Sequence, residues 1–158
     1  GLIRALWAVL GGAPQMDNEN GKWGVAEFDQ DIEKPMPAGN YKAHISNITI
    51  ADKTDNYWMI IDFEIIEHDE FLGCQPDPYF ILLGSRLEGK QRDVKQGLQK
   101  YAQLGSSVNV NLNNRSGKEA ANDLLHCKCT IKFGQVGTGI NSKNPIYGVF
   151  RYEGEGNV

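Results

Sequence analysis

The clearest structural pattern in the sequence is Tyr57-Trp58-Met59-Ile60-Ile61-Asp62-Phe63-Glu64-Ile65, whose residues sort into two faces with a period of two. Successive side chains of a β-strand point to opposite sides of the sheet, so every second residue shares a face. One face of this segment is wholly apolar and consists of Tyr57, Met59, Ile61, Phe63 and Ile65. The opposite face starts with Trp58 and Ile60 and continues with two acids. The pattern predicts a half-buried strand over residues 57–67.

A strand with the same period precedes this segment, and a shorter strand follows it. From residue 40 onward the alternation runs through Tyr41, Lys42, Ala43, His44, Ile45 and Ser46. It changes phase at Asn47, which predicts a β-bulge near that residue. Residues 52–56 are polar and predict a turn between the two strands. The apolar run at residues 79–83 predicts a short third strand.

After the third strand, the spacing of apolar residues changes to that of a helix. Between residues 90 and 104 the apolar positions that recur at helical spacing are Val94, Leu98, Tyr101 and Leu104. Gly105 then predicts the end of the helix, and a second, shorter helical turn fits residues 118–125. Residues 126–133 predict a fourth strand, with Cys127, Cys129, Ile131 and Phe133 on its buried face. Residues 146–152 predict a fifth.

Three strands, a helix and two further strands are the order of elements in an OB-fold, a small Greek-key β-barrel. The sequence therefore predicts a mainly β protein with one or two helices and a five-stranded OB-fold-like barrel. An open β-sandwich is the alternative, because five strands can be arranged in more than one way. We expect a short N-terminal helix and an extended arm in residues 1–39, the barrel in residues 40–153, and a short acidic tail in residues 154–158.

The composition argues against a membrane protein and against a disulfide-stabilised one. No apolar run approaches the ~20 residues that a membrane-spanning helix needs. The chain has 3 cysteines, which is an odd number and too few for a disulfide framework. Cys127 and Cys129 lack a second pair of ligands at zinc spacing, so we expect them to be buried as small apolar residues. A reducing, cytoplasmic location follows.

Charge is divided unevenly along the chain, although the formal net charge is only −4. Residues 1–70 hold 13 acids and 5 bases, a balance of −8. Residues 71–158 hold 7 acids and 11 bases, a balance of +4. A nucleic acid requires a local positive surface and not a positive total, so this division permits a phosphate-binding face in the second half.

Basic residues alternate with aromatic ones on the predicted outer faces of several strands. Lys128 and Lys132 lie outside on the fourth strand, and Tyr147 and Arg151 lie outside on the fifth if Phe150 and Tyr152 pack inward. The other candidates come from the first strand, the second strand and two loops, and are Lys42, His44, Trp58, Lys53 and Lys143. Single-stranded nucleic acid is bound by cations along its phosphates and by flat rings on which bases stack, at about 1–3 kcal/mol per base. The glycine-rich loop at residues 134–145 is a candidate to fold over a bound strand.

The residues that suggest catalysis do not form a consistent set. Gly84-Ser85-Arg86-Leu87-Glu88-Gly89-Lys90-Gln91 matches a phosphate-binding P-loop except at its end, where Gln91 replaces the required Ser or Thr. Glu88 would also place a carboxylate beside the phosphates. The 3 histidines lie on unrelated elements, and the acids around residues 62–70 fit the solvated side of a strand and its turn. We therefore expect no enzyme activity, no metal and no cofactor.

The chain resembles a family of phage-encoded single-stranded-DNA-binding proteins, long catalogued as proteins of unknown function, over residues 27–153. The resemblance is carried by the order of short segments, which are Phe28-Asp29-Gln30-Asp31, Pro37-Ala38-Gly39-Asn40-Tyr41, Phe71-Leu72-Gly73, Leu104-Gly105, Asn122-Asp123-Leu124-Leu125-His126-Cys127 and Asn144-Pro145-Ile146-Tyr147-Gly148. It implies an OB-fold protein that coats single-stranded DNA during viral replication or recombination in a bacterial host. The family often has Gly at the position of His126 and a longer acidic tail, which the family commonly uses to recruit replication or recombination proteins.

A second hypothesis is a structural or adaptor β-domain that mediates protein–protein contacts or oligomerisation. The apolar segment at residues 2–10 and the acidic first half of the chain support this hypothesis. It predicts a homo-oligomer that depends on the N-terminal segment and does not bind DNA.

Overall fold

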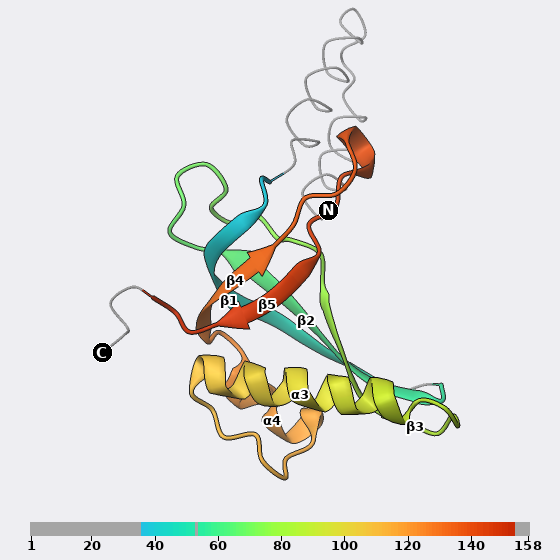
Figure 1. Cartoon of the computed structure of the whole chain (residues 1–158). Coiled ribbons are helices and arrows are strands. Elements are labelled where there is room, and N and C mark those ends of the chain that lie inside the picture. Colours follow the sequence, from blue (N-terminus) through green and yellow to red (C-terminus); the bar gives the residue numbers. More distant parts are fainter. Residues whose placement is uncertain (1–35, 53, 154–158) are drawn as a thin grey trace, which may run out of the picture. The chain divides into compact units, whose positions relative to one another are not determined.

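The computed structural model describes residues 36–52 and 54–153 (Figure 1). The predicted helix and arm before residue 36, Lys53, and the predicted tail at residues 154–158 lie outside the described residues. Residues 137–142 group apart from the body formed by residues 36–136 and 143–153, and are described by themselves.

The body contains five strands and two helices in the predicted order (Figure 1). The elements are β1 (Gly39–Ala51), β2 (Asn56–Ile65), β3 (Tyr79–Ser85), α3 (Gln91–Val108), α4 (Gly117–Leu124), β4 (Lys128–Phe133) and β5 (Ile146–Phe150). The strands form one sheet in the order β3-β2-β1-β4-β5, and every neighbouring pair is antiparallel. The sheet curls into a nearly closed barrel, so the predicted OB-fold-like architecture is confirmed.

The first strand is long enough to belong to both sides of the barrel. Its residues 39–44 pair with β4, and its residues 43–51 pair with β2. The register with β2 shifts between Ile45 and Asn47, so the bulge predicted near Asn47 is confirmed. A bulge bends a strand and increases its twist, which allows β1 to curve around the core.

The barrel interior is filled by the apolar faces that the period of two predicts. Met59, Ile61, Phe63 and Ile65 of β2 have 0% exposure, and Tyr57 at the strand's start is half-buried. The core also includes residues of the neighbouring strands, namely Ala43, Ile45, Cys129, Ile131 and Phe133. Each large apolar side chain removed from water contributes about 1.5–3 kcal/mol, so this interior stabilises the barrel.

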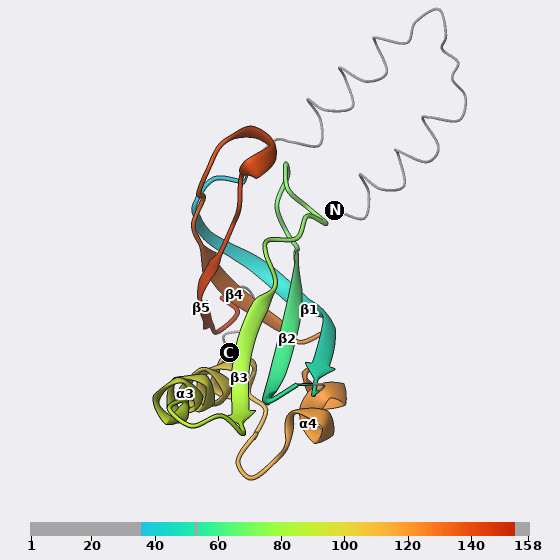
Figure 2. The ribbon, with the colours of Figure 1, turned by 90° about the vertical axis from the view of Figure 1, so that its right-hand side faces the viewer.

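Helix α3 lies across the seam between β3 and β5, which do not pair with each other in the described ladders (Figure 2). Gly97 touches the backbone of β3 so closely that a Cβ there would lie 1.8 Å from the Leu82 carbonyl oxygen. At the other end of the helix, Ser107 Oγ donates a hydrogen bond of 2.8 Å to the Val149 carbonyl of β5. The helix therefore provides a hydrogen-bond donor for the Val149 carbonyl, which has no partner from a β3–β5 ladder among the described residues.

The contact at Gly97 sets the rotation of α3 about its axis, so the apolar residues of the helix that face the core differ in part from the predicted ones. Tyr101 and Leu104 are buried as expected, but Val94 is only half-buried and Leu98 is 48% exposed. The core-facing stripe is centred on Gly97, Tyr101 and Leu104, so Val94 and Leu98 lie on the flank of the helix. Gly105 does not end the helix either, because the left-handed residue that caps it is Asn109, with φ 62°.

The second helix begins at a capping box. Ser116 Oγ accepts a hydrogen bond from the Glu119 amide at 3.1 Å, and Glu119 Oε1 accepts one from the Ser116 amide at 2.9 Å. These two bonds satisfy donors at the helix start. The observed helix, Gly117–Leu124, begins and ends one residue earlier than the predicted residues 118–125.

Candidate nucleic-acid interface

The fifth strand presents a different set of side chains from the predicted one. Val149 is 2% exposed and faces the core, whereas Phe150 is 45% exposed. The expectation that Phe150 and Tyr152 pack inward is therefore wrong. The cause is a register shift between Lys132 and Phe133, which leaves Tyr147 as an extra residue in β5 and reverses the alternation after it.

Reversal of the alternation brings Tyr152 together with two predicted basic residues. The Tyr152 ring centroid lies 5.4 Å from Lys128 Nζ and 5.7 Å from Lys42 Nζ. Both distances are within the range of a cation–π interaction. The Tyr152 hydroxyl donates a hydrogen bond to Glu67 Oε2, and Lys42 Nζ lies 3.5 Å from Glu67 Oε1. Tyr152 thus contacts two ammonium groups and a single carboxylate.

Lys132 and Phe150 extend this arrangement along the same outer face. Lys132 is exposed and lies opposite Gly148 of β5, while Phe150 lies opposite Thr130. The Phe150 ring covers Gly148, since a Cβ there would approach a ring carbon to 2.8 Å. We call this surface the β4–β5 face; its residues are Lys42, Lys128, Lys132, Phe150 and Tyr152. It combines three cations with two aromatic rings.

A second aromatic surface lies on the outer side of β2 and β3. The rings of Trp58 and Phe80 meet edge to face, with centroids 6.0 Å apart and planes at 89°. Ile60 pairs with Phe80 across the two strands. We call this surface the β2–β3 patch; its residues are Trp58, Ile60 and Phe80. The position of Trp58 on the outer face agrees with the period of β2, and Phe80, at 49% exposure, joins it there.

The outer face between these two surfaces carries carboxylates. His44 Nε2 and Glu64 Oε1 are 2.8 Å apart, and Asn47 Nδ2 donates to Asp62 Oδ2 at 3.4 Å. His44 therefore already has an acidic partner, and Asp62 adds a further negative charge. A phosphate group would be repelled here, so the β4–β5 face and the β2–β3 patch are separate surfaces and not one uninterrupted track.

Three further predicted residues, Lys143, Tyr147 and Arg151, are not gathered into the β4–β5 face. Lys53 lies outside the described residues. Lys143 is exposed at the base of the loop, where its backbone pairs with Val136 through bonds of 2.8 and 2.9 Å. Tyr147 is exposed and its ring rests on Gly134, and Arg151 is exposed next to Tyr152. Within residues 137–142, the glycine-rich loop forms a short 3₁₀ helix, Gly139–Asn141.

Sequence reasoning missed Phe80, Phe150 and Tyr152 as outer-face residues. The signal for Phe80 was present, because Tyr79 and Phe80 must face opposite sides of a strand. It was obscured by the continuous apolar run of residues 79–83. No sequence signal located the extra residue in β5, which decides the orientation of Phe150 and Tyr152.

The segment that resembles a P-loop does not leave its lysine unpaired. Lys90 Nζ lies 3.6 Å from Asp93 Oδ2 on the first turn of α3. Ser85 Oγ donates to Asn56 Oδ1 at 2.6 Å and accepts from the Leu87 amide at 3.1 Å, so its hydroxyl fixes the connection. Among residues 36–52 and 54–153, no group of three or more His, Cys, Asp or Glu side chains is placed to hold a metal ion.

Of the two cysteines that we expected to be buried, Cys129 is buried and Cys127 is half-buried. Burial raises the pKa of the Cys129 thiol to about 12, and Cys127 beside it adds to this effect. The thiolate of Cys129 is therefore suppressed at neutral pH, which makes it a poor nucleophile. Cys74 is exposed and lies on a different part of the body.

No protein-family model matches the chain, and no curated protein matches it in sequence. None of the described helices has the length and apolar character that a membrane crossing would need.

Proposed function

We propose that this chain binds single-stranded DNA with little sequence preference and without catalysing a reaction, as a protein of phage replication or recombination in the cytoplasm of a bacterial host. The observation that carries the proposal is the β4–β5 face, in which Lys42, Lys128 and Lys132 are interleaved with Phe150 and Tyr152. The OB-fold-like barrel and the resemblance to phage single-stranded-DNA-binding proteins support it. The resemblance alone carries the choice of DNA, phage and host.

The β4–β5 face suits a flexible, unpaired strand better than a duplex. Lysine ammonium groups attract phosphates of any sequence, and an aromatic ring stacks on any base. Only an unpaired base can lie flat on the Phe150 or Tyr152 ring, because the bases of a duplex already stack on one another. We therefore expect binding to tolerate any sequence, because the described side chains of this face would contact phosphates and the planes of bases and not the edges of particular bases.

The bound strand must displace an existing contact. Glu67 neutralises part of the charge of Lys42 and accepts the hydroxyl hydrogen bond of Tyr152. A phosphate that approaches Lys42 competes with this carboxylate, so the affinity of the face is held below what three free lysines would give. The β2–β3 patch supplies further stacking surface, and Trp58 there is a natural fluorescent reporter.

The proposal is tested by replacing the lysines and one ring of the β4–β5 face. We expect the double variant Lys128→Ala/Lys132→Ala to bind a labelled oligothymidine at least tenfold more weakly, because two phosphate contacts are lost. Tyr152→Ala should weaken binding by about the stacking energy of one base, ~1–3 kcal/mol. Fluorescence anisotropy measures both.

The matched control is Lys118→Ala on α4, which removes an exposed lysine that lies outside the face. Its affinity should stay within about twofold of the unchanged protein. Equal affinity of the double variant and this control would contradict the proposed surface. Trp58→Phe should abolish any fluorescence quenching that DNA causes at that site, and any quenching that remains then comes from Trp7 and Trp23.

The adaptor hypothesis stays as a second candidate because Leu98 of α3 and Leu87, which precedes the helix, are exposed. It is favoured if the chain shows no DNA binding at low salt and forms oligomers that disappear when residues 1–12 are removed. A DNA affinity that persists after this removal would favour the first candidate.

A further inference from the structure

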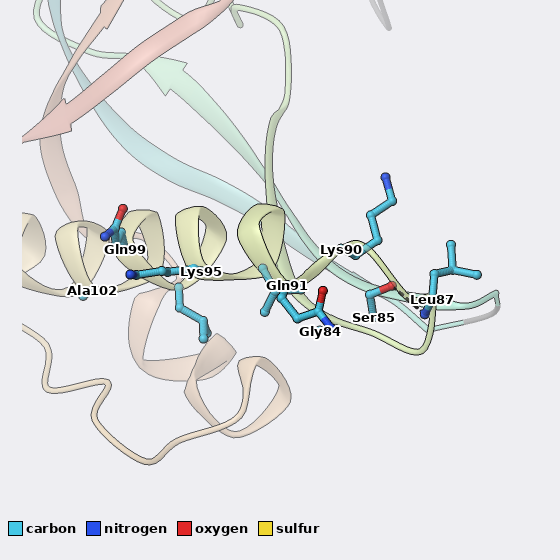
Figure 3. Close-up of a pocket in the computed structure, with 10 residues that line it drawn as sticks. Gly84, Ser85, Leu87, Lys90, Gln91, Lys95, Gln99 and Ala102 are labelled. Atoms are coloured by element: carbon cyan, nitrogen blue, oxygen red, sulfur yellow. Dashed lines mark hydrogen bonds between the residues drawn. The ribbon is translucent and has the colours of Figure 1, made fainter.

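We infer that a groove beside α3 is a docking site for an acidic protein segment that carries apolar anchor side chains. The groove has a volume of about 650 Å³ and runs between the first three turns of α3 and the connection that precedes the helix (Figure 3). This inference concerns a surface outside the β4–β5 face and does not depend on DNA binding.

The floor of the groove is apolar. Val94, Leu98 and Ala102 follow one another at intervals of four residues, so they form a stripe along one side of the helix. Leu87 of the β3–α3 connection also lines the groove. Leu98 and Leu87 are 48% and 43% exposed. Single exposed apolar residues are common, but four that line one groove form a patch that favours a partner.

This exposure follows from the packing of the helix and is not a local irregularity. Gly97 brings α3 into contact with the Leu82 backbone, which commits Tyr101 and Leu104 to the core. The same contact leaves the 94/98/102 stripe on the flank of the helix, beside the end of β3 and the connection that follows it. An apolar stripe that is partly exposed on the flank of a well-packed helix is available to a second molecule.

The charges that line the groove are of one sign. Among the described residues of the lining, Lys90 and Lys95 are the charged ones and none is a carboxylate, although the whole chain carries a net charge of −4. In the described part of the chain, Lys95 forms no ion pair, whereas Lys90 pairs with Asp93 at 3.6 Å. An acidic segment is therefore the complementary partner.

A protein segment fits this lining better than a nucleic acid does. None of the described residues that line the groove is aromatic, so they offer no ring on which a base can stack. Residues 91–102 of α3 span about 17 Å at 1.5 Å per residue. This length accepts about five residues of an extended chain, or a short amphipathic helix whose apolar side chains lie in the groove.

The test uses the full chain and a short fluorescent peptide in which leucines are flanked by aspartates. We expect fluorescence anisotropy to show binding that weakens with salt. Leu98→Ser should reduce the affinity about tenfold, and Lys95→Glu should reduce it about fivefold. Arg92→Glu is the matched control, since it makes the same charge change at an exposed position of α3 outside the groove, and it should change the affinity less than twofold.

Two further peptides define the chemistry. A peptide with lysines in place of the aspartates, and one with serines in place of the leucines, should both fail to bind. Thermal unfolding of each variant near the temperature of the unchanged protein confirms that the exposed substitutions leave the fold intact.

Three results would overturn the inference. The first is no binding of the aspartate peptide at low salt. The second is an equal affinity for the lysine peptide. The third is a loss of oligothymidine binding in Lys95→Glu without an effect on the peptide, which would assign the groove to nucleic acid. The DNA affinity of the Lys128→Ala/Lys132→Ala variant is measured separately, so this inference and the proposed function can fail independently.

Discussion

The substitution Gly97→Ala tests the packing of α3 against the barrel, because two physical effects predict opposite signs. Alanine is the better helix former, by about 1 kcal/mol in a helix interior. The Cβ of alanine at this position, however, would lie 1.8 Å from the Leu82 carbonyl oxygen and 2.8 Å from its carbonyl carbon. Both atoms belong to the backbone of β3, so no side-chain rotation relieves the clash.

The size of the loss can be worked from these distances. Ordinary contact begins at about 3.4 Å, so α3 must move away from β3 by about 1.6 Å. Such a movement strains the bond of 2.8 Å between Ser107 Oγ and the Val149 carbonyl, which is worth about 1 kcal/mol. Overpacking itself costs about 1–3 kcal/mol. After the helix-propensity gain is subtracted, the free energy of unfolding should fall by about 2 kcal/mol.

Urea and thermal unfolding measure this effect. A loss of about 2 kcal/mol corresponds to a melting temperature about 4–8 °C lower for a chain of this size. Ala102→Gly, at an exposed position of the same helix, calibrates the propensity term and should lose about 1 kcal/mol. If Gly97→Ala were as stable as the unchanged protein or more stable, the close contact between α3 and β3 would be refuted.

Three further predictions concern a buried amide, a buried thiol and a surface acid. Asn144→Asp should lower the free energy of unfolding by about 2–4 kcal/mol. Asn144 Nδ2 donates to the Met36 and Gly134 carbonyls at 2.9 and 2.8 Å, and a carboxylate in its place would repel both. Urea unfolding measures the loss, and Asn113→Asp at an exposed position is the control. The pKa of Cys129 is about 12 in the folded protein against 9.0 for a free thiol. The contribution of this neutral thiol to stability is therefore complete below pH 9 and falls by about 1.4 kcal/mol per pH unit as the pH rises towards 12. Unfolding measured at several alkaline pH values, with Cys129→Ala as the comparison, would show this loss. Glu67→Gln should bind oligothymidine about two- to threefold more tightly, because the carboxylate beside Lys42 and Tyr152 is removed; weaker binding would contradict the proposed competition with phosphate.

The course of the strands could be predicted because their burial is periodic. Residues 57–65 alternate without interruption, so the core face of β2 follows directly from the sequence. The bulge in β1 was also visible, since the phase of the alternation changes within the strand at Asn47. Local sequence patterns carry such features whenever one face of a strand is buried and the other is not.

The rotation of α3 and the orientation of β5 could not be predicted in the same way. Both depend on contacts between elements that are distant in sequence. Gly97 approaches Leu82, and this contact decides which of two possible apolar stripes of α3 faces the core. The extra residue at Tyr147 depends on the pairing between β4 and β5, and it decides that Phe150 and Tyr152 lie on the outer face.

For the candidate site, the sequence located cations better than aromatic rings. Lys42, Lys128 and Lys132 come together on the outer face, where strand period predicts them. Their aromatic neighbours, Phe150 and Tyr152, were expected in the core. Lysine is placed reliably because it is rarely buried, whereas an aromatic residue is stable on either side of a sheet.

The proposed function rests on one claim, which is that the outer face of the barrel binds single-stranded DNA through its lysines. The most direct test is the affinity of the full chain for oligothymidine at a series of salt concentrations. If Lys42, Lys128 and Lys132 each engage one phosphate, the logarithm of the binding constant should fall with the logarithm of the salt concentration with a slope of about −2. Duplex DNA of the same length should bind more weakly at every salt concentration. No binding of oligothymidine at low salt, or an affinity that does not change with salt, would contradict the claim.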